Sequence, residues 1–299
     1  MFRPLSAAMA SNAPKRPEDP HRTASPPRAL RERGSHDREV PRVVEYDRIP
    51  ETPMADQTSS APTPTSRGAR QIGAPDVFDF VTAVLGADDA AATALVQGLL
   101  ADAVSVEAIY LDLLAPAARE LGTRWEEDEC SFVDVTVAMG RVHRVLRELS
   151  QAFQAEGPSS NQAGQILLTC LPGEQHTLGL IMVAEFLIRE GFRVHVGSPW
   201  AEADLLDLIR TEWFDVVGFS AGCESRLSTM KREIQRLRAV SCNPQLQVLV
   251  GGQVFSLDPS LVERVGADGW ARDAASSADT VRALCAAVGR TTSQSGATA

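Results

Sequence analysis

Residues 167–179 read Leu-Leu-Thr-Cys-Leu-Pro-Gly-Glu-Gln-His-Thr-Leu-Gly, and this stretch decides the fold of the 299-residue chain. An apolar run ends at a Pro-Gly break, and a helical pattern of apolar residues begins directly after it. These features predict a buried parallel strand, a tight loop and a crossover helix. Ligands of open α/β sheets bind outside the carboxyl ends of the strands. We therefore expect His176 to face a ligand.

The neighbours of His176 suit a metal-ligating imidazole. Such an imidazole usually has its second nitrogen held by a carboxylate, and Glu174 lies two residues before it. Gly179 lies three residues after it and would let a bulky planar group approach the backbone. On these residues alone, a polar loop histidine at the start of a helix is an equal alternative.

Downstream of this stretch, strand and helix patterns alternate through five units. Their order predicts an α/β, Rossmann-like or flavodoxin-like doubly wound parallel five-stranded sheet with strand order 2-1-3-4-5. We place this domain at residues 164–290. The predicted strands cover 165–169, 193–197, 215–220, 247–250 and 269–271, and the predicted helices cover 177–190, 202–211, 225–240, 259–265 and 275–288.

Residues 74–155 carry four amphipathic helical patterns and predict a four-helix bundle ahead of the sheet. Ser105 is the expected N-cap of the third helix, and Pro116 should bend or split that helix. Ser131, followed three residues later by Asp134, resembles a capping box that starts the fourth. The N-terminal 1–73 tail and linker, and the C-terminal 291–299 segment, are expected to be disordered because they lack periodic apolar residues.

Composition and charge limit the class of protein. The net charge of the chain is −10. Residues 1–50 hold ten Arg/Lys and seven Asp/Glu, a net charge of +3, so the remainder of the chain has a net charge of −13. An acidic body argues against a DNA-binding domain, so we expect any DNA contact to be indirect or weak. The five cysteines are widely spaced and indicate neither a disulfide framework nor a zinc site. No apolar run is long enough to cross a bilayer, and we expect a cytoplasmic protein with no membrane contact.

Three loops that follow the central predicted strands carry unusual residues. The first holds Glu174-Gln175-His176-Thr177-Leu178-Gly179, the second Gly218-Phe219-Ser220-Ala221-Gly222-Cys223, and the third Val250-Gly251-Gly252-Gln253. Ser220 follows His176 by 44 residues, and Gly251 follows Ser220 by 31. In this order and behind a helical bundle, the loops resemble the cobalamin-binding domain of the methionine synthase family over residues 76–288.

This resemblance implies a ligand set for cobalamin bound in the base-off form. His176 would be the lower axial cobalt ligand, and Glu174 would hold its second nitrogen. Most relatives have Asp at the position of Glu174. Ser220 would bind the displaced base, and the nucleotide tail would pass Gly251 and Gly252, where close approach requires glycine. The implied contacts also include Thr177, Leu178, Gly179, Ala221 and Gly222.

Three further residues have alternative interpretations. Trp125 could cap the upper face of the corrin or fill the bundle core. His143 could be an upper cobalt ligand or a packed histidine at the rim of the core. Cys223 could be a redox switch, although a small packing residue is favoured beside the expected cofactor slot.

The second and first loops look most like those of the AerR/PpaA antirepressors. That resemblance implies a non-enzymatic, light- or redox-responsive regulator that binds hydroxo- or adenosylcobalamin and opposes a PpsR/CrtJ-type repressor of photosynthesis genes. One alternative is a corrinoid methyl-carrier protein that serves a methyltransferase. Another is a haem-binding sensor on the same fold.

Overall fold

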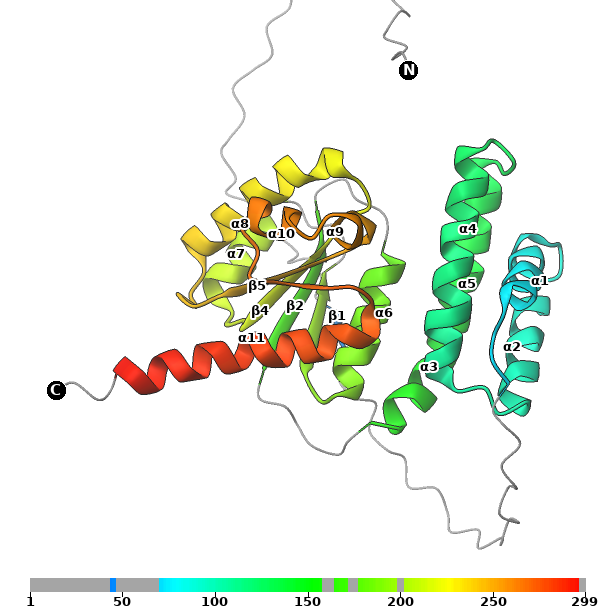
Figure 1. Cartoon of the computed structure of the whole chain (residues 1–299), viewed down its shortest axis with the longest axis horizontal. Coiled ribbons are helices and arrows are strands. Elements are labelled where there is room, and N and C mark those ends of the chain that lie inside the picture. Colours follow the sequence, from blue (N-terminus) through cyan, green and yellow to red (C-terminus); the bar gives the residue numbers. More distant parts are fainter. Residues whose placement is uncertain (1–43, 47–69, 158–163, 172–176, 198–201, 296–299) are drawn as a thin grey trace, which may run out of the picture. The chain divides into compact units, whose positions relative to one another are not determined.

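The computed structural model describes residues 44–46, 70–157, 164–171, 177–197 and 202–295. A single six-stranded sheet forms the centre of the C-terminal part (Figure 1). Its strands are β1 (Val44–Tyr46), β2 (Gln165–Cys170), β3 (Arg193–Gly197), β4 (Val216–Ser220), β5 (Gln247–Gly251) and β6 (Gly269–Ala271).

The strand order is β1-β3-β2-β4-β5-β6, and β2 to β6 are all parallel. Taken alone, these five strands have the predicted order 2-1-3-4-5, so the doubly wound sheet is confirmed. The chain leaves β2 toward β3 on one side, and β4 continues the sheet on the other. The carboxyl ends of β2 and β4 therefore flank the topological switch point, where such sheets bind ligands.

Alternate residues of the strands fill two separate cores, because successive side chains point to opposite faces of a sheet. On one face, Leu167, Val217 and Val248 pack against α7 (Glu202–Thr211), α8 (Leu227–Val240) and α10 (Leu261–Val265). On the other face, Ile166 and Val216 pack against α6 (Leu178–Arg189) and α11 (Ala274–Ser295). Helices thus cover both faces (Figure 1). Short helices η2 (Glu224–Arg226) and α9 (Gln253–Leu257) follow β4 and β5.

Residues 74–155 form the bundle. Its elements are α1 (Ala74–Leu85), α2 (Ala91–Ala101), α3 (Val106–Ala108), the π-helical segment η1 (Ile109–Leu114), α4 (Ala115–Glu126) and α5 (Phe132–Ala155). The hydroxyl of Ser105 accepts a hydrogen bond from the amide of Ala108, and Ser131 and Asp134 form a reciprocal capping box, so both predicted caps are confirmed. No described helix is long and apolar enough to cross a bilayer.

Pro116 divides the third predicted helix, as its sequence position indicates. A proline cannot donate the backbone hydrogen bond that a helix interior needs. The chain is π-helical up to Leu114, where the amide of Ala115 donates to the carbonyl of Tyr110, and α-helical from Ala115 onward. The proline lies in the first turn of α4, where its missing N–H costs least.

Two boundaries differ from the prediction. Within residues 1–73, expected to be disordered throughout, Val44–Tyr46 forms β1 and pairs antiparallel with the edge of β3. β-branched and aromatic residues favour strands, and an open sheet edge can pair with another strand. Within residues 291–299, α11 continues to Ser295. No proline follows Gly289, so nothing stops the helix at that glycine.

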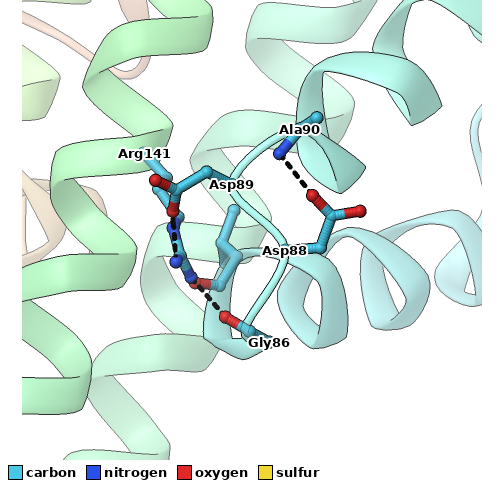
Figure 2. Close-up of polar contacts among 6 residues, drawn as sticks. Gly86, Asp88, Asp89, Ala90 and Arg141 are labelled. Atoms are coloured by element: carbon cyan, nitrogen blue, oxygen red, sulfur yellow. Dashed lines mark hydrogen bonds and ion pairs between the residues drawn. The ribbon is translucent and has the colours of Figure 1, made fainter.

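A buried arginine fastens the α1–α2 connection to α5. The Nη1 atom of Arg141 donates to the carbonyls of Val84 and Gly86, each at 2.6 Å, and its Nε donates to Asp89 Oδ1 at 2.9 Å. Figure 2 shows the guanidinium group directed at Asp89 and the Gly86 carbonyl. The hydrogen bond from Arg141, and then its positive charge, lower the pKa of Asp89. This network lets a polar loop pack against the bundle with its carbonyls satisfied.

We expect Arg141→Met to lower the free energy of unfolding by about 2 kcal/mol, because the buried carbonyl of Val84 and the partly buried hydrogen bond to Gly86 lose their donor. Urea unfolding measures this difference. Arg147→Met, at an exposed position of the same helix, is the matched control and should change stability by less than about 0.5 kcal/mol. Equal effects of the two substitutions would contradict the role given to Arg141.

Candidate functional site

A cavity of about 610 Å³ lies at the carboxyl ends of the strands and is lined by both the sheet and the bundle. From the sheet side, its wall includes Ser220 at the end of β4 and Gly251 at the end of β5. Gly179, near the start of α6, also lines it, and a Cβ atom built there would meet no atom within 4 Å. Of the residues predicted to bind a cofactor, the structure therefore brings together Gly179, Ser220, Gly251 and Gly252.

Gly252 shapes the edge of this cavity through its backbone. Its φ angle is +114°, and a Cβ atom there would lie 2.1 Å from the carbonyl oxygen of Ala221. The amide of Ala221 donates to the carbonyl of Gly251 at 3.0 Å, which holds the two loops together beyond the ends of β4 and β5. Only glycine fits at this position, because every other residue would clash with the neighbouring backbone.

The bundle contributes one helical face to the cavity. Leu111, Asp112, Ala115 and Arg119 lie on η1 and α4 and line the cavity at a spacing of about one turn. None of these four residues was predicted from the sequence to bind a ligand. The i, i+4, i+8 series of Leu111, Ala115 and Arg119 was visible in the sequence, but it does not reveal that this face meets the ends of the strands.

The sheet contributes further polar residues, of which only Gln253 stood in a loop that the sequence singled out. Arg272 and Asp273 follow β6, and Gln253 and Ser256 lie on α9. The side chain of Asp273 caps the start of α11, where its Oδ1 accepts a hydrogen bond from the amide of Ser276 at 2.8 Å. Arg119 of the bundle and Arg272 of the sheet thus both line the cavity, and arginine side chains bind phosphate or amide oxygens.

Of the other predicted residues, Glu174 and His176 are outside the described residues. Thr177 directly precedes α6, and Leu178 is buried in the core of the bundle. Ala221 is buried in the sheet core, whereas Gly222 is exposed.

Cys223 and Trp125 are both exposed. The sulfur of Cys223 lies 3.1 Å from the hydroxyl of Ser225. Trp125 lies at the end of α4, and neither side chain is part of the cavity lining. Trp125 is therefore not a plug of the bundle core.

A buried carboxylate joins the bundle to α6, the helix that follows the histidine loop. Glu185 accepts hydrogen bonds from the hydroxyl of Ser150, at 2.9 and 2.8 Å to its two oxygens, and from Nε2 of Gln154 at 2.9 Å. Burial raises the pKa of Glu185, and these hydrogen bonds offset part of that rise. Leu178, Met182 and Phe186 of α6 complete the bundle core beside it, so α5 and α6 pack as one unit.

The hydrogen bond between Ser150 of α5 and Glu185 of α6 shows which face of α5 carries His143. His143 precedes Ser150 by seven residues, and residues seven apart lie on the same face of a helix, about 10 Å apart along its axis. His143 therefore lies on the face of α5 that meets α6, nearer the start of α5. Burial, and then the charge of Arg147, lower its pKa, so its neutral form is favoured. It is not part of the cavity lining among the described residues.

The structure thus joins a doubly wound sheet to a helical bundle around one cavity at the switch point, which is the arrangement of a ligand-binding protein. Residues 164–279 match the family described as "B12 binding domain", and residues 78–150 match a second family of the same description. The chain belongs to the cobalamin-binding family, and both parts characteristic of it are present.

Individual relatives agree with this assignment. The chain is 30% identical over 165 residues to an "Uncharacterized 20.5 kDa protein in bchF-crtJ intergenic region" of Rhodobacter capsulatus, covering 55% of this chain and 85% of that protein. It is 25% identical over 162 residues to the "Dimethylamine corrinoid protein" of Methanosarcina barkeri, covering 54% of this chain and 75% of that protein.

A solved structure shares the fold. The monomethylamine corrinoid protein of Methanosarcina barkeri superimposes with a TM-score of 0.58 at 19% identity, over 71% of this chain and 99% of that one.

The cavity residues fit a corrinoid group. The wall of the cavity is largely apolar, and Leu111, Ala115 and Met182 are among its lining residues. Such a wall suits the flat, largely apolar face of a corrin ring. The backbone is bare at Gly179 and Gly251, where a large planar group could lie close. Arg119 and Arg272 are lining residues that would bind polar groups of such a cofactor. The described part of the chain holds no cluster of three His, Cys, Asp or Glu residues for an isolated metal ion.

We expect Gly252→Ala to lower the free energy of unfolding by more than about 2 kcal/mol, since alanine is strained at a positive φ and would meet the Ala221 carbonyl. Gly222→Ala is the control, because a Cβ at Gly222 meets nothing within 4 Å. Urea unfolding of both variants compares them. A Gly252→Ala protein as stable as the Gly222→Ala protein would refute the close-packed edge of the cavity.

The raised pKa of Glu185 should make the free energy of unfolding depend on pH. Its pKa in the folded protein lies above its ordinary value of 4.5, so between these two values the folded state holds a proton that the unfolded state releases. The contribution of Glu185 to stability therefore falls as pH rises through this interval. Urea unfolding of the wild type and Glu185→Gln between about pH 4 and pH 8 isolates it. The wild-type-minus-variant difference should decrease with pH, and a difference independent of pH would contradict the burial argument.

Proposed function

We propose that this chain binds cobalamin in the base-off form, with His176 as the lower axial ligand, and acts as a regulator of gene expression rather than as an enzyme. The observation that carries the proposal is the shared cavity, because a ligand held there contacts the bundle and the sheet at once. A change in the ligand's state can then shift the balance between two arrangements of these parts. Bound cobalamin supplies an axial cobalt bond that light or a change of redox state can alter.

The partner that we propose is a PpsR/CrtJ-type repressor of photosynthesis genes, which the chain would oppose as an antirepressor. The 30%-identical Rhodobacter capsulatus relative is named for its place in the bchF-crtJ intergenic region. The histidine and serine loops resemble those of the AerR/PpaA antirepressors. The negative charge of the body suits a partner with a basic DNA-binding surface.

A corrinoid methyl carrier is the second candidate. It is favoured by the similarity to the dimethylamine corrinoid protein and by the fold shared with the monomethylamine corrinoid protein. A single-turnover assay for transfer of a cobalt-bound methyl group separates the two functions. Transfer at a catalytic rate to an added methyl acceptor would support the carrier and overturn the regulator.

Absorption spectra test cofactor binding. The protein is mixed with hydroxo- or adenosylcobalamin, desalted, and measured in darkness and after illumination. We expect corrin bands that stay with the protein and change on illumination. His176→Ala should shift or lose these bands, whereas the control His143→Ala should keep the corrin because the lower ligand is intact.

Loss of all corrin from the wild type on desalting, or a haem Soret band in the protein as purified, would overturn cobalamin as the cofactor. The regulatory role has its own readout. Binding of a purified PpsR/CrtJ-type repressor to its operator DNA should change on addition of the cobalamin-loaded protein, and differently in light and dark. An unchanged affinity in both conditions would contradict the antirepressor role.

A further inference from the structure

Helix α8 concentrates basic residues in a chain whose net charge is −10. Residues 226–238 hold five Lys/Arg and one Asp/Glu, whereas the whole chain holds 29 and 39. A local excess of positive charge on an acidic protein is typical of a surface that binds anions.

The exposed residues of α8 share one side of the helix. Four of them lie three, four, seven or ten residues after Ser228, which is the spacing of one helical face, and all are exposed. The opposite side of α8, with Met230 and Ile234, is buried against the sheet. We call the exposed residues the basic face: Ser228, Lys231, Arg232, Gln235 and Arg238.

A buried carboxylate accompanies the arginines of this helix. The side chain of Glu233 is 1% exposed, and its Oε1 lies 3.6 Å from Nε of Arg232 and 3.7 Å from Nη1 of Arg236. These distances are those of ion pairs without a hydrogen bond. The side chain of Arg232 is 62% exposed, so its guanidinium group is accessible to an anion from solvent.

The other members of the basic face differ in how far their charge is compensated. Arg238 is paired with Asp268 at 2.5 Å. Lys231 forms no ion pair within the part of the chain that the structure describes. Lys231 and Arg232 are therefore the two adjacent cations that the basic face presents to solvent.

The helices packed beside α8 do not set unpaired carboxylates against these cations. On α7, Asp207 is paired with Arg210 at 2.6 Å. On α10, the exposed Glu263 is followed directly by the exposed Arg264. The positive charge of the basic face is thus retained at the surface.

The composition of the basic face favours a nucleic acid over a protein as its ligand. No large exposed hydrophobic side chain lies on α8 among the described residues. The cores of protein–protein interfaces are depleted of charged residues and enriched in aromatic ones. Protein–DNA interfaces are instead polar and strongly positive.

We propose that the basic face binds the phosphate backbone of double-stranded DNA without regard to base sequence. Resting on the proposed function in gene regulation, we assign this contact to DNA beside the operator of the repressor. Few cations take part, so the contact is weak and adds to the affinity of a complex that the repressor already holds on DNA.

The basic face can be tested separately from cofactor binding. Helix α8 covers the face of the sheet opposite to α6, the helix that shares its core with the bundle. None of the residues of the basic face belongs to the described lining of the cavity. Variants of Lys231 and Arg232 should therefore keep their corrin bands.

The experiment titrates a short fluorescent DNA duplex of unrelated sequence with the full-length, cobalamin-loaded protein, without repressor, and measures anisotropy at several salt concentrations. The wild type should bind at low salt with a Kd on the order of 10 to 100 µM. Lys231→Gln/Arg232→Gln should raise the Kd roughly tenfold at low salt and lower the slope of log Kd against log salt by about 2.

Two further variants control for net charge and for folding. Arg147→Gln/Arg193→Gln, at exposed positions of α5 and β3, removes the same charge and should bind like the wild type. Because Arg232 also accompanies the buried Glu233, Lys231→Gln alone is the second test variant, and it should lower the salt slope by about 1. Circular dichroism checks that every variant is folded.

The outcomes separate this proposal from the proposed function. A wild type that does not bind the duplex at low salt, or an equal loss of affinity in both double variants, overturns the basic face. Tighter binding of poly-L-glutamate than of the duplex would make an acidic protein segment the ligand and would also overturn it. If the duplex binds through Lys231 and Arg232 while repressor–operator binding never changes, the antirepressor role fails and the DNA contact stands.

Discussion

The contact between Gly252 and the carbonyl of Ala221 is the constraint on which the site depends. It lets the loops after β4 and β5 run side by side, so the ends of both strands open toward one cavity. A side chain at this position would push the loops apart. Because β2, β4 and β5 are adjacent parallel strands, their carboxyl ends lie at one edge, and the cavity inherits residues from each of them.

The bundle completes this cavity because its own core is shared with the sheet domain. Phe186 of α6 packs with Tyr110 and Phe153 of the bundle, at ring-centre distances of 6.4 and 4.8 Å. Ser150 and Gln154 fasten the same helix through Glu185. Displacement of the bundle would therefore disturb α6, the helix that follows the histidine loop. In the proposed function, this coupling connects the state of the cofactor to the outer surface of the bundle.

Local patterns in the sequence were sufficient to predict much of this fold. The Pro-Gly break, the alternating strands and helices, and the caps at Ser105 and Ser131 each depend on nearby residues, and each was predicted. The features that escaped prediction depend on packing between distant segments. Arg119 lines the cavity only because α4 meets the strand ends, and Arg141 binds carbonyls more than fifty residues away. No local pattern contains such information. Equally, the pairing of Val44–Tyr46 depends on the open edge of β3.

We propose that this chain holds cobalamin through His176, and electron paramagnetic resonance of the cobalt(II) form distinguishes this ligand from the cofactor's own base. The unpaired electron of cobalt(II) couples to an axial nitrogen, and ¹⁴N splits each cobalt line into three whereas ¹⁵N splits it into two. With protein labelled with ¹⁵N-histidine and cobalamin of natural isotope content, we expect doublets, which become triplets with unlabelled protein. Triplets that persist in the labelled protein would show that the cofactor keeps its own base, and would contradict histidine ligation.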